Sequence, residues 1–171
     1  ARLSGDEQAV FRAFAVFAGG FTLAAAERVA AEDREGQDAG GGDRERHPIT
    51  SSPSPILVAT VTSLARQNLV IQDAWAPDAA EPRFRMLEPL RLFALDRLRA
   101  AGEESLVRRR HAAYFAEAAE ALDELTLGSD PEIWFEEQAR ELDNFRAALD
   151  WALANNEHRI VAHIVAYVAQ F

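Results

Sequence analysis

Residues 55–102 read PILVATVTSLARQNLVIQDAWAPDAAEPRFRMLEPLRLFALDRLRAAG, and the periodicity of this segment changes along its length. Residues 55–66 repeat apolar side chains at helical spacing, which predicts a helix. NLVIQD (68–73) and RFRML (83–87) then flank a tip that carries two prolines and has no apolar period. This pattern predicts a β-hairpin with a long tip.

Helix signals upstream complete the expected unit. Ser4 and Glu7 match a capping box for a first helix, which we expect to end at the Gly-Gly pair of residues 19–20. Thr22 has the side-chain chemistry to cap a second helix. Three helices followed by a hairpin are the layout of a winged helix. We therefore predict a winged-helix domain over residues 1–101.

The rest of the chain is predicted to be helical, so the fold class is mainly α. Successive antiparallel helices with short turns are typical of an α-solenoid, and residues 102–171 are predicted to begin a TPR-like helical domain. One expected helix begins at Pro89 and ends before Gly102, and the next runs from Glu103 to about Leu127. Another begins at Pro131 and has a break near Asp143-Asn144. The last follows a turn at Asn155-Asn156.

Residues 32–54 differ in composition from the segments on either side. They are polar and Gly-rich and then Ser/Pro-rich, with nothing that could build a core. This composition predicts a flexible loop inside the winged-helix domain. A regulatory loop phosphorylated at Ser51, Ser52 or Ser54 is the alternative, and the sequence leaves the role of the loop open.

The composition excludes several classes of site. The chain has 18 basic and 28 acidic residues, a net charge of -10, and every basic residue is an arginine. Without lysine it cannot carry a Walker A phosphate loop or a Schiff-base lysine, and without cysteine it cannot carry a disulfide or a thiol nucleophile. It contains no membrane-spanning apolar run and opens with no secretory signal, so we expect a cytoplasmic protein.

The two ends of the sequence indicate a piece of a longer protein. The chain begins with Ala1 rather than methionine. Its last residues, IVAHIVAYVAQF (160–171), carry an apolar helical pattern that ends without a cap.

Five stretches of the sequence together resemble a known protein family. They occur in one order as FRAFAVFAGGFTLAAAERVA (11–30), SLARQNLV (63–70), RFRMLEPLRLFALDRLRAAGE (83–103), RRRHAAYFAEAAE (108–120) and ELDNFRAALDWAL (141–153). Together they resemble the middle of large bacterial AfsR/LuxR-type regulators, which are STAND ATPases related to the NB-ARC proteins. The resemblance implies a winged-helix subdomain that follows a nucleotide-binding core, and then the first repeats of a helical sensor domain.

One motif of that family can be placed residue by residue. NB-ARC winged helices carry Met-His-Asp at a strand-to-helix junction, where the His approaches the phosphates of the bound nucleotide. Met86-Leu87-Glu88 stand at this place: Met86 matches, Glu88 keeps the negative charge, and Leu87 replaces the His. The resemblance implies that these three residues face the nucleotide without a direct phosphate contact. The residue types alone favour packing of Met86 and Leu87 in the core under the hairpin.

Other candidate sites are weak. The third helix of a winged helix often binds DNA, but here Arg66 is its only charged residue, so we expect no DNA binding by this segment. The run Arg108–Arg110 starts a Glu-rich helix and is expected to make ion pairs or an interdomain contact. No catalytic motif is present, and we expect no enzymatic activity. Metal-ligand spacing is absent among the four histidines, His47, His111, His158 and His163, so no metal site is expected.

We therefore expect a non-catalytic segment of an ATP-dependent bacterial transcriptional regulator, which couples a nucleotide-binding domain to a helical sensor domain. No cofactor is expected in the segment itself, whereas ATP or ADP is implied for the parent protein. The expected partners are the upstream nucleotide-binding domain and a protein or small-molecule signal on the helical domain. Two alternatives stay open: a free-standing winged-helix DNA-binding regulator, and a helical protein–protein adaptor.

Overall fold

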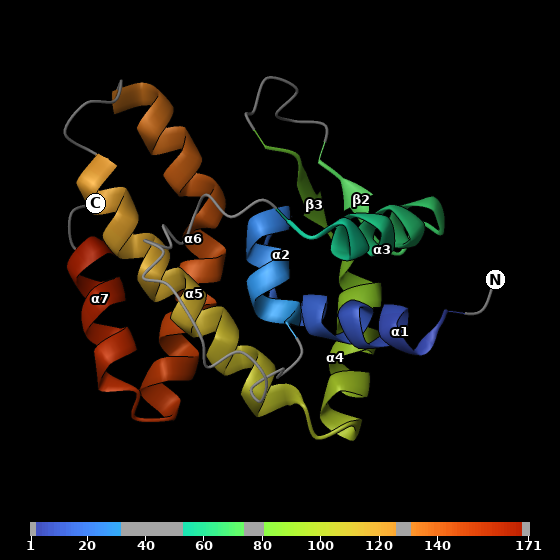
Figure 1. The fold of residues 1–171 in the computed structure, drawn as a ribbon. Coiled ribbons are helices and arrows are strands. Elements are labelled where there is room, and N and C mark those ends of the chain that lie inside the picture. The colour runs from blue at the N-terminus through green and yellow to red at the C-terminus, as the bar shows by residue number, and fades with distance from the viewer. Residues whose placement is uncertain (1–2, 32–52, 74–80, 126–130, 169–171) are drawn as a thin grey trace, which may run out of the picture.

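The computed structural model describes residues 3–31, 53–73, 81–125 and 131–168, and these are mainly helical (Figure 1). The mainly α class is thereby confirmed, whereas the winged-helix and TPR-like assignments and the domain boundary after residue 101 stay predictions. The helices are α1 (Gly5–Ala13), α2 (Leu23–Ala30), α3 (Pro55–Arg66), α4 (Glu88–Ala100), α5 (Glu104–Leu125), α6 (Pro131–Ala154) and α7 (His158–Val168). A 3-10 turn, η1 (Phe14–Val16), follows α1, and the strands are β1 (Phe21–Thr22), β2 (Ile71–Gln72) and β3 (Arg83–Arg85).

A small antiparallel sheet connects the first four helices. β2 pairs with β3, as the hairpin prediction requires, although both strands are shorter than predicted. β1 pairs with the other edge of β3, which places Phe21 opposite Phe84 and gives the order β1-β3-β2. We did not predict β1, because a two-residue strand has no period and depends on a partner distant in sequence. The hairpin tip at residues 74–80 lies outside the described residues.

Side-chain caps set the starts of the first helices. The Ser4 hydroxyl accepts a hydrogen bond from the Glu7 N–H (3.2 Å), and the Glu7 carboxylate accepts one from the Ser4 N–H (2.7 Å), which confirms the capping box. The Thr22 hydroxyl accepts a hydrogen bond from a backbone N–H of α2 and so caps this helix, as predicted. At the end of α4, Gly102 takes a φ of 73°, where glycine has no steric cost.

The sequence misplaced one boundary in this half of the chain. α1 ends at Ala13 and η1 at Val16, before residues 19–20, because the chain becomes extended at Phe17. The predicted end of the loop at residue 54 is correct, since Ser54 is extended and its hydroxyl accepts a hydrogen bond from the Leu57 N–H at the start of α3. Residues 32–52 of that predicted loop lie outside the described residues.

The predicted break near Asp143-Asn144 is wrong, because α6 is a single helix from Pro131 to Ala154. Asparagine disfavours helix interiors because its side chain competes for nearby backbone groups. In this helix the Asn144 side chain has partners outside the helix, so that competition is removed. The predicted turn at Asn155-Asn156 is confirmed, and Asn156 takes a φ of 59° there.

One hydrophobic core extends through both halves of the molecule, the half made by α1–α4 and the half made by α5–α7. Its largest members are the fully buried rings of Phe14, Phe17, Phe21, Phe115 and Phe145. α5 contacts α2 on one side and α6 and α7 on the other (Figure 1). The core is therefore continuous across the predicted domain boundary. None of the described helices is both long and apolar enough to cross a membrane.

Several large apolar side chains are exposed. The exposed fraction is 73% for Ile56, 51% for Phe93 and 45% for Leu87. Apolar spacing marks one face of a helix but does not say how much of that face its neighbours cover. The predicted packing of Leu87 in the core is wrong, whereas Met86 is buried as predicted.

Candidate functional site

The segment Met86-Leu87-Glu88 joins β3 to α4. Met86 packs into the core, and Leu87 is the N-cap residue of α4 with an exposed side chain. The Glu88 carboxylate receives two hydrogen bonds of 2.8 Å from Arg91, which lower the pKa of Glu88. Arg91 also donates to the Ala15 carbonyl oxygen at 3.2 Å. Glu88 is thus engaged by its own helix, and a contact of this segment with nucleotide stays a prediction.

An apolar surface lies beside this junction, between α1 and α4. We call it the Phe93 surface and define it by the residues around a cavity of about 500 Å³, which include Leu3, Phe11, Leu69, Leu90 and Phe93. A second cavity of about 500 Å³ shares Leu3, Phe11 and Phe93 with it. The Arg97 guanidinium lies 5.0 Å from the centre of the Phe93 ring. Exposed apolar surface with an aromatic centre is typical of protein contact sites.

The outward surface of α3 carries little charge. Arg66 is its charged residue, and Val58, Ala59 and Thr62 are exposed beside it. The Thr62 hydroxyl donates to the Val58 carbonyl oxygen at 2.7 Å, so its donor is already used within the helix. A DNA-reading helix needs several free polar side chains at base edges and cations at phosphates, and α3 offers mainly Arg66.

The most extensive polar contact between the two halves is made by Asn144. This residue of α6 is fully buried. Its carbonyl oxygen accepts hydrogen bonds from the N–H groups of Ala18 (3.0 Å) and Gly19 (3.4 Å). Its amide donates to the Gly20 carbonyl oxygen (2.8 Å) and to the Glu141 carboxylate (2.9 Å). One side chain therefore fixes the backbone of residues 18–20, which links η1 to β1, against α6.

Ion pairs surround Asn144 and connect the same two halves. Glu141, one turn before Asn144, pairs with Arg83 of β3, and the side chains are only 19% and 11% exposed. Arg28 of α2 pairs with Glu117 of α5 at 2.5 Å. Partly buried pairs with well-made hydrogen bonds fix a geometry more than they add stability. We call Asn144, Glu141 and Arg83 the junction cluster.

His111 of α5 completes the junction on its apolar side. It is fully buried, with its ring 5.2 Å from that of Phe17 and 4.7 Å from that of Phe115. Its Nε2 atom has no hydrogen-bond partner among the described residues. Burial lowers the pKa of His111 to about 3, and the nearby Arg108 charge acts in the same direction. His111 is therefore neutral at physiological pH.

Sequence analysis missed the junction cluster. The signal was the asparagine inside ELDNFRAALDWAL (141–153), a poor helix former directly before Phe145 in an otherwise helical pattern. We interpreted it as a helix break instead of a buried hydrogen-bonding residue. No group of three or more His, Cys, Asp or Glu residues that could hold a metal ion occurs within the described parts of the chain.

The chain is similar to a small part of two mycobacterial proteins. It is 32% identical over 155 residues to "Putative HTH-type transcriptional regulator Rv0890c" of Mycobacterium tuberculosis and to a Mycobacterium bovis protein of the same description, Mb0914c. The match covers 91% of this chain but only 15% of each relative. No family model matches the chain, and no solved structure matches it.

Proposed function

We propose that this chain is a non-catalytic, cytoplasmic regulatory segment of a multidomain transcriptional regulator. The observation that carries the proposal is the similarity along 91% of the chain to proteins named as transcriptional regulators, of which it spans 15%. A segment of that size, with no metal-ligand group among its described residues, suits a part that relays contacts between other domains.

The proposed relay has two parts. The Phe93 surface offers exposed apolar side chains for contact with a neighbouring domain. The junction cluster fixes the α1–α4 half to the α5–α7 half, so that a displacement of one half is carried to the other. Transmission of this kind requires contacts that differ between two states of the whole regulator.

ATP dependence is a further part of the proposal and rests on the sequence resemblance alone. In that scheme the Phe93 surface and Leu87 contact an upstream nucleotide-binding domain, with Met86 and Glu88 at the edge of the contact. The α5–α7 half receives a protein or small-molecule signal.

Direct DNA binding is the second candidate function. The observation in its favour is the description of the relatives as HTH-type regulators, which fits this candidate more directly than it fits ATP dependence. Arg66 on the exposed side of α3 is the residue that would contact DNA. The net charge of -10 and the scarcity of free donors on α3 oppose it.

Fluorescence anisotropy with a random-sequence DNA duplex separates the two functions. We expect the 171-residue chain to bind the duplex no more tightly than about 10⁻⁴ M at physiological salt, the weak limit of non-specific binding. Arg146→Ala, a substitution of an exposed arginine on α6, is the matched control for Arg66→Ala. Salt-dependent micromolar binding that Arg66→Ala removes and Arg146→Ala leaves unchanged would establish the DNA-binding function instead.

A further inference from the structure

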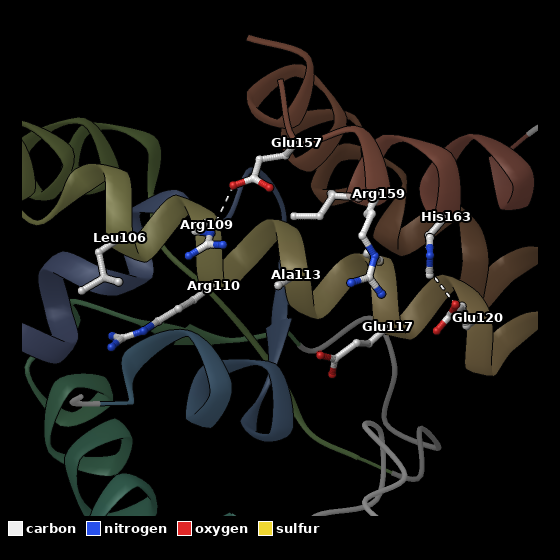
Figure 2. A pocket seen from close by; sticks show the side chains of 11 residues that line it. Leu106, Arg109, Arg110, Ala113, Glu117, Glu120, Glu157, Arg159 and His163 are labelled. Atoms are coloured by element: carbon white, nitrogen blue, oxygen red, sulfur yellow. Dashed lines mark hydrogen bonds and ion pairs between the residues drawn. The ribbon is translucent and has the colours of Figure 1, made fainter. Parts of the chain in front are cut away.

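A groove separates α5 from the first turns of α7, on the far side of α5 from the sheet (Figure 2). Its volume is about 550 Å³, within the range of small-molecule sites. Ala113, Ala116 and Ile160 form an apolar floor. Charged side chains of both helices form its walls, so the groove can hold a ligand with an apolar part and a charged part.

The carboxylates of the groove already have partners among basic side chains. Glu157 accepts a hydrogen bond from Arg109 at 3.2 Å, and Glu120 lies 2.5 Å from the Nδ1 atom of His163 (Figure 2). The third carboxylate, Glu117, pairs with Arg28, which reaches it from α2 outside the groove. The Arg109–Glu157 pair and the Glu120–His163 contact therefore close the ends of the groove without using all of its positive charge.

Arg159 is a further cation of the groove, beside Arg109 and Arg110. It extends from α7 across the groove toward α5, between Ala113 and Glu117 (Figure 2). It is exposed and makes no ion pair with any residue in the part of the chain that the structure describes. The chain has a net charge of -10, so its surface as a whole attracts cations. A concave surface that holds an arginine without an ion-pair partner among the described residues can instead attract an anion.

We propose that this groove binds a small organic anion, with its carboxylate on Arg159 and its compact apolar body on Ala113, Ala116 and Ile160. A planar guanidinium receives a carboxylate through two parallel hydrogen bonds, which gives the site its preference for this head group. The role of the groove as the signal-receiving site of a regulator rests on the proposed function, but ligand binding itself does not.

Benzoate tests the proposal, because it combines a carboxylate with a compact apolar ring. We titrate the ¹⁵N-labelled 171-residue chain with benzoate and follow the backbone amide shifts. Shifts are expected along residues 106–120 and 157–163. Benzyl alcohol lacks the charge and is expected to bind at least about tenfold more weakly, since a charge-assisted pair is stronger than a neutral one. Inorganic phosphate lacks the ring and is expected to bind at least about tenfold more weakly, since it buries no apolar surface on the alanines and Ile160. Equal binding of either probe would contradict the proposed ligand class.

Substitutions locate the site. Arg159→Ala is expected to weaken benzoate binding about tenfold, because it removes the charged partner. Ala113→Leu fills the floor and should abolish binding while Arg159 stays in place. Arg146→Ala on α6 is the matched control and should bind benzoate as the unchanged chain does. Circular dichroism melting checks that all three variants are folded. Unaltered binding by folded Arg159→Ala and Ala113→Leu variants would overturn the proposal, whatever the function of the regulator.

Discussion

Replacement of Asn144 by alanine is expected to lower the free energy of unfolding by about 3 kcal/mol, since a hydrogen bond contributes on the order of 1 kcal/mol and three well-made ones are lost. Those three bonds join the Asn144 side chain to Ala18, Gly20 and Glu141 at 3.0, 2.8 and 2.9 Å. Alanine is the better helix former, so local helix propensity opposes the effect and cannot cause it. Urea unfolding followed by circular dichroism measures the change.

Asn155 provides the matched control for this substitution. It follows the end of α6, is exposed, and donates only to the Trp151 carbonyl oxygen at 2.8 Å. Asn155→Ala is expected to change the free energy of unfolding by less than about 0.5 kcal/mol, as is usual for exposed positions. Equal effects of the two substitutions would show that Asn144 does not hold the halves together.

Acid is expected to destabilise the folded chain through His111. Its folded pKa of about 3 lies below the ordinary value of 6.5, so the unfolded chain binds more protons between these values. Stability from this group is complete above pH 6.5 and is lost as the pH falls, by about 1.4 kcal/mol per pH unit. Between pH 7 and pH 5 the unfolding free energy should fall by about 2 kcal/mol from this residue alone.

The variant His111→Leu isolates this effect from the titration of carboxylates. Leucine fills a similar volume and removes the Nε2 atom that has no partner within the described residues, so the variant loses only the hydrogen bond between the His111 side chain and Asn144 and should be folded at pH 7. Its free energy of unfolding should fall about 2 kcal/mol less than that of the unchanged chain between pH 7 and pH 5. His158→Gln, at an exposed position, should behave as the unchanged chain does. Identical pH dependence in the unchanged chain and His111→Leu would contradict a buried neutral His111.

The elements that sequence predicted well are those whose cause is local. The Ser4–Glu7 box, the Thr22 cap and the bounds of α3 follow from side chains within a few residues of the helix end. Gly102 was also placed correctly, because a left-handed turn after a helix selects glycine.

The elements that sequence missed depend on partners far along the chain. β1 exists because β3 lies beside it, and α6 continues because Asn144 bonds to backbone groups more than 120 residues away. The exposure of Leu87 and Phe93 likewise depends on which surfaces the other helices cover. The junction cluster is of this kind, since Arg83 and Glu141 show no relation in the sequence.

We expect the chain to act in transcriptional regulation through protein contact at the Phe93 surface. The most direct test is the transcript profile of cells in which the intact regulator carries Phe93→Ser. The matched control is Leu153→Ser, another exposed apolar position, on α6. Both are surface substitutions and should leave protein levels unchanged. Altered transcript levels are expected with Phe93→Ser and unaltered levels with Leu153→Ser. A profile with Phe93→Ser identical to that of the unchanged regulator, at equal protein level, would contradict a role of the Phe93 surface in transcription.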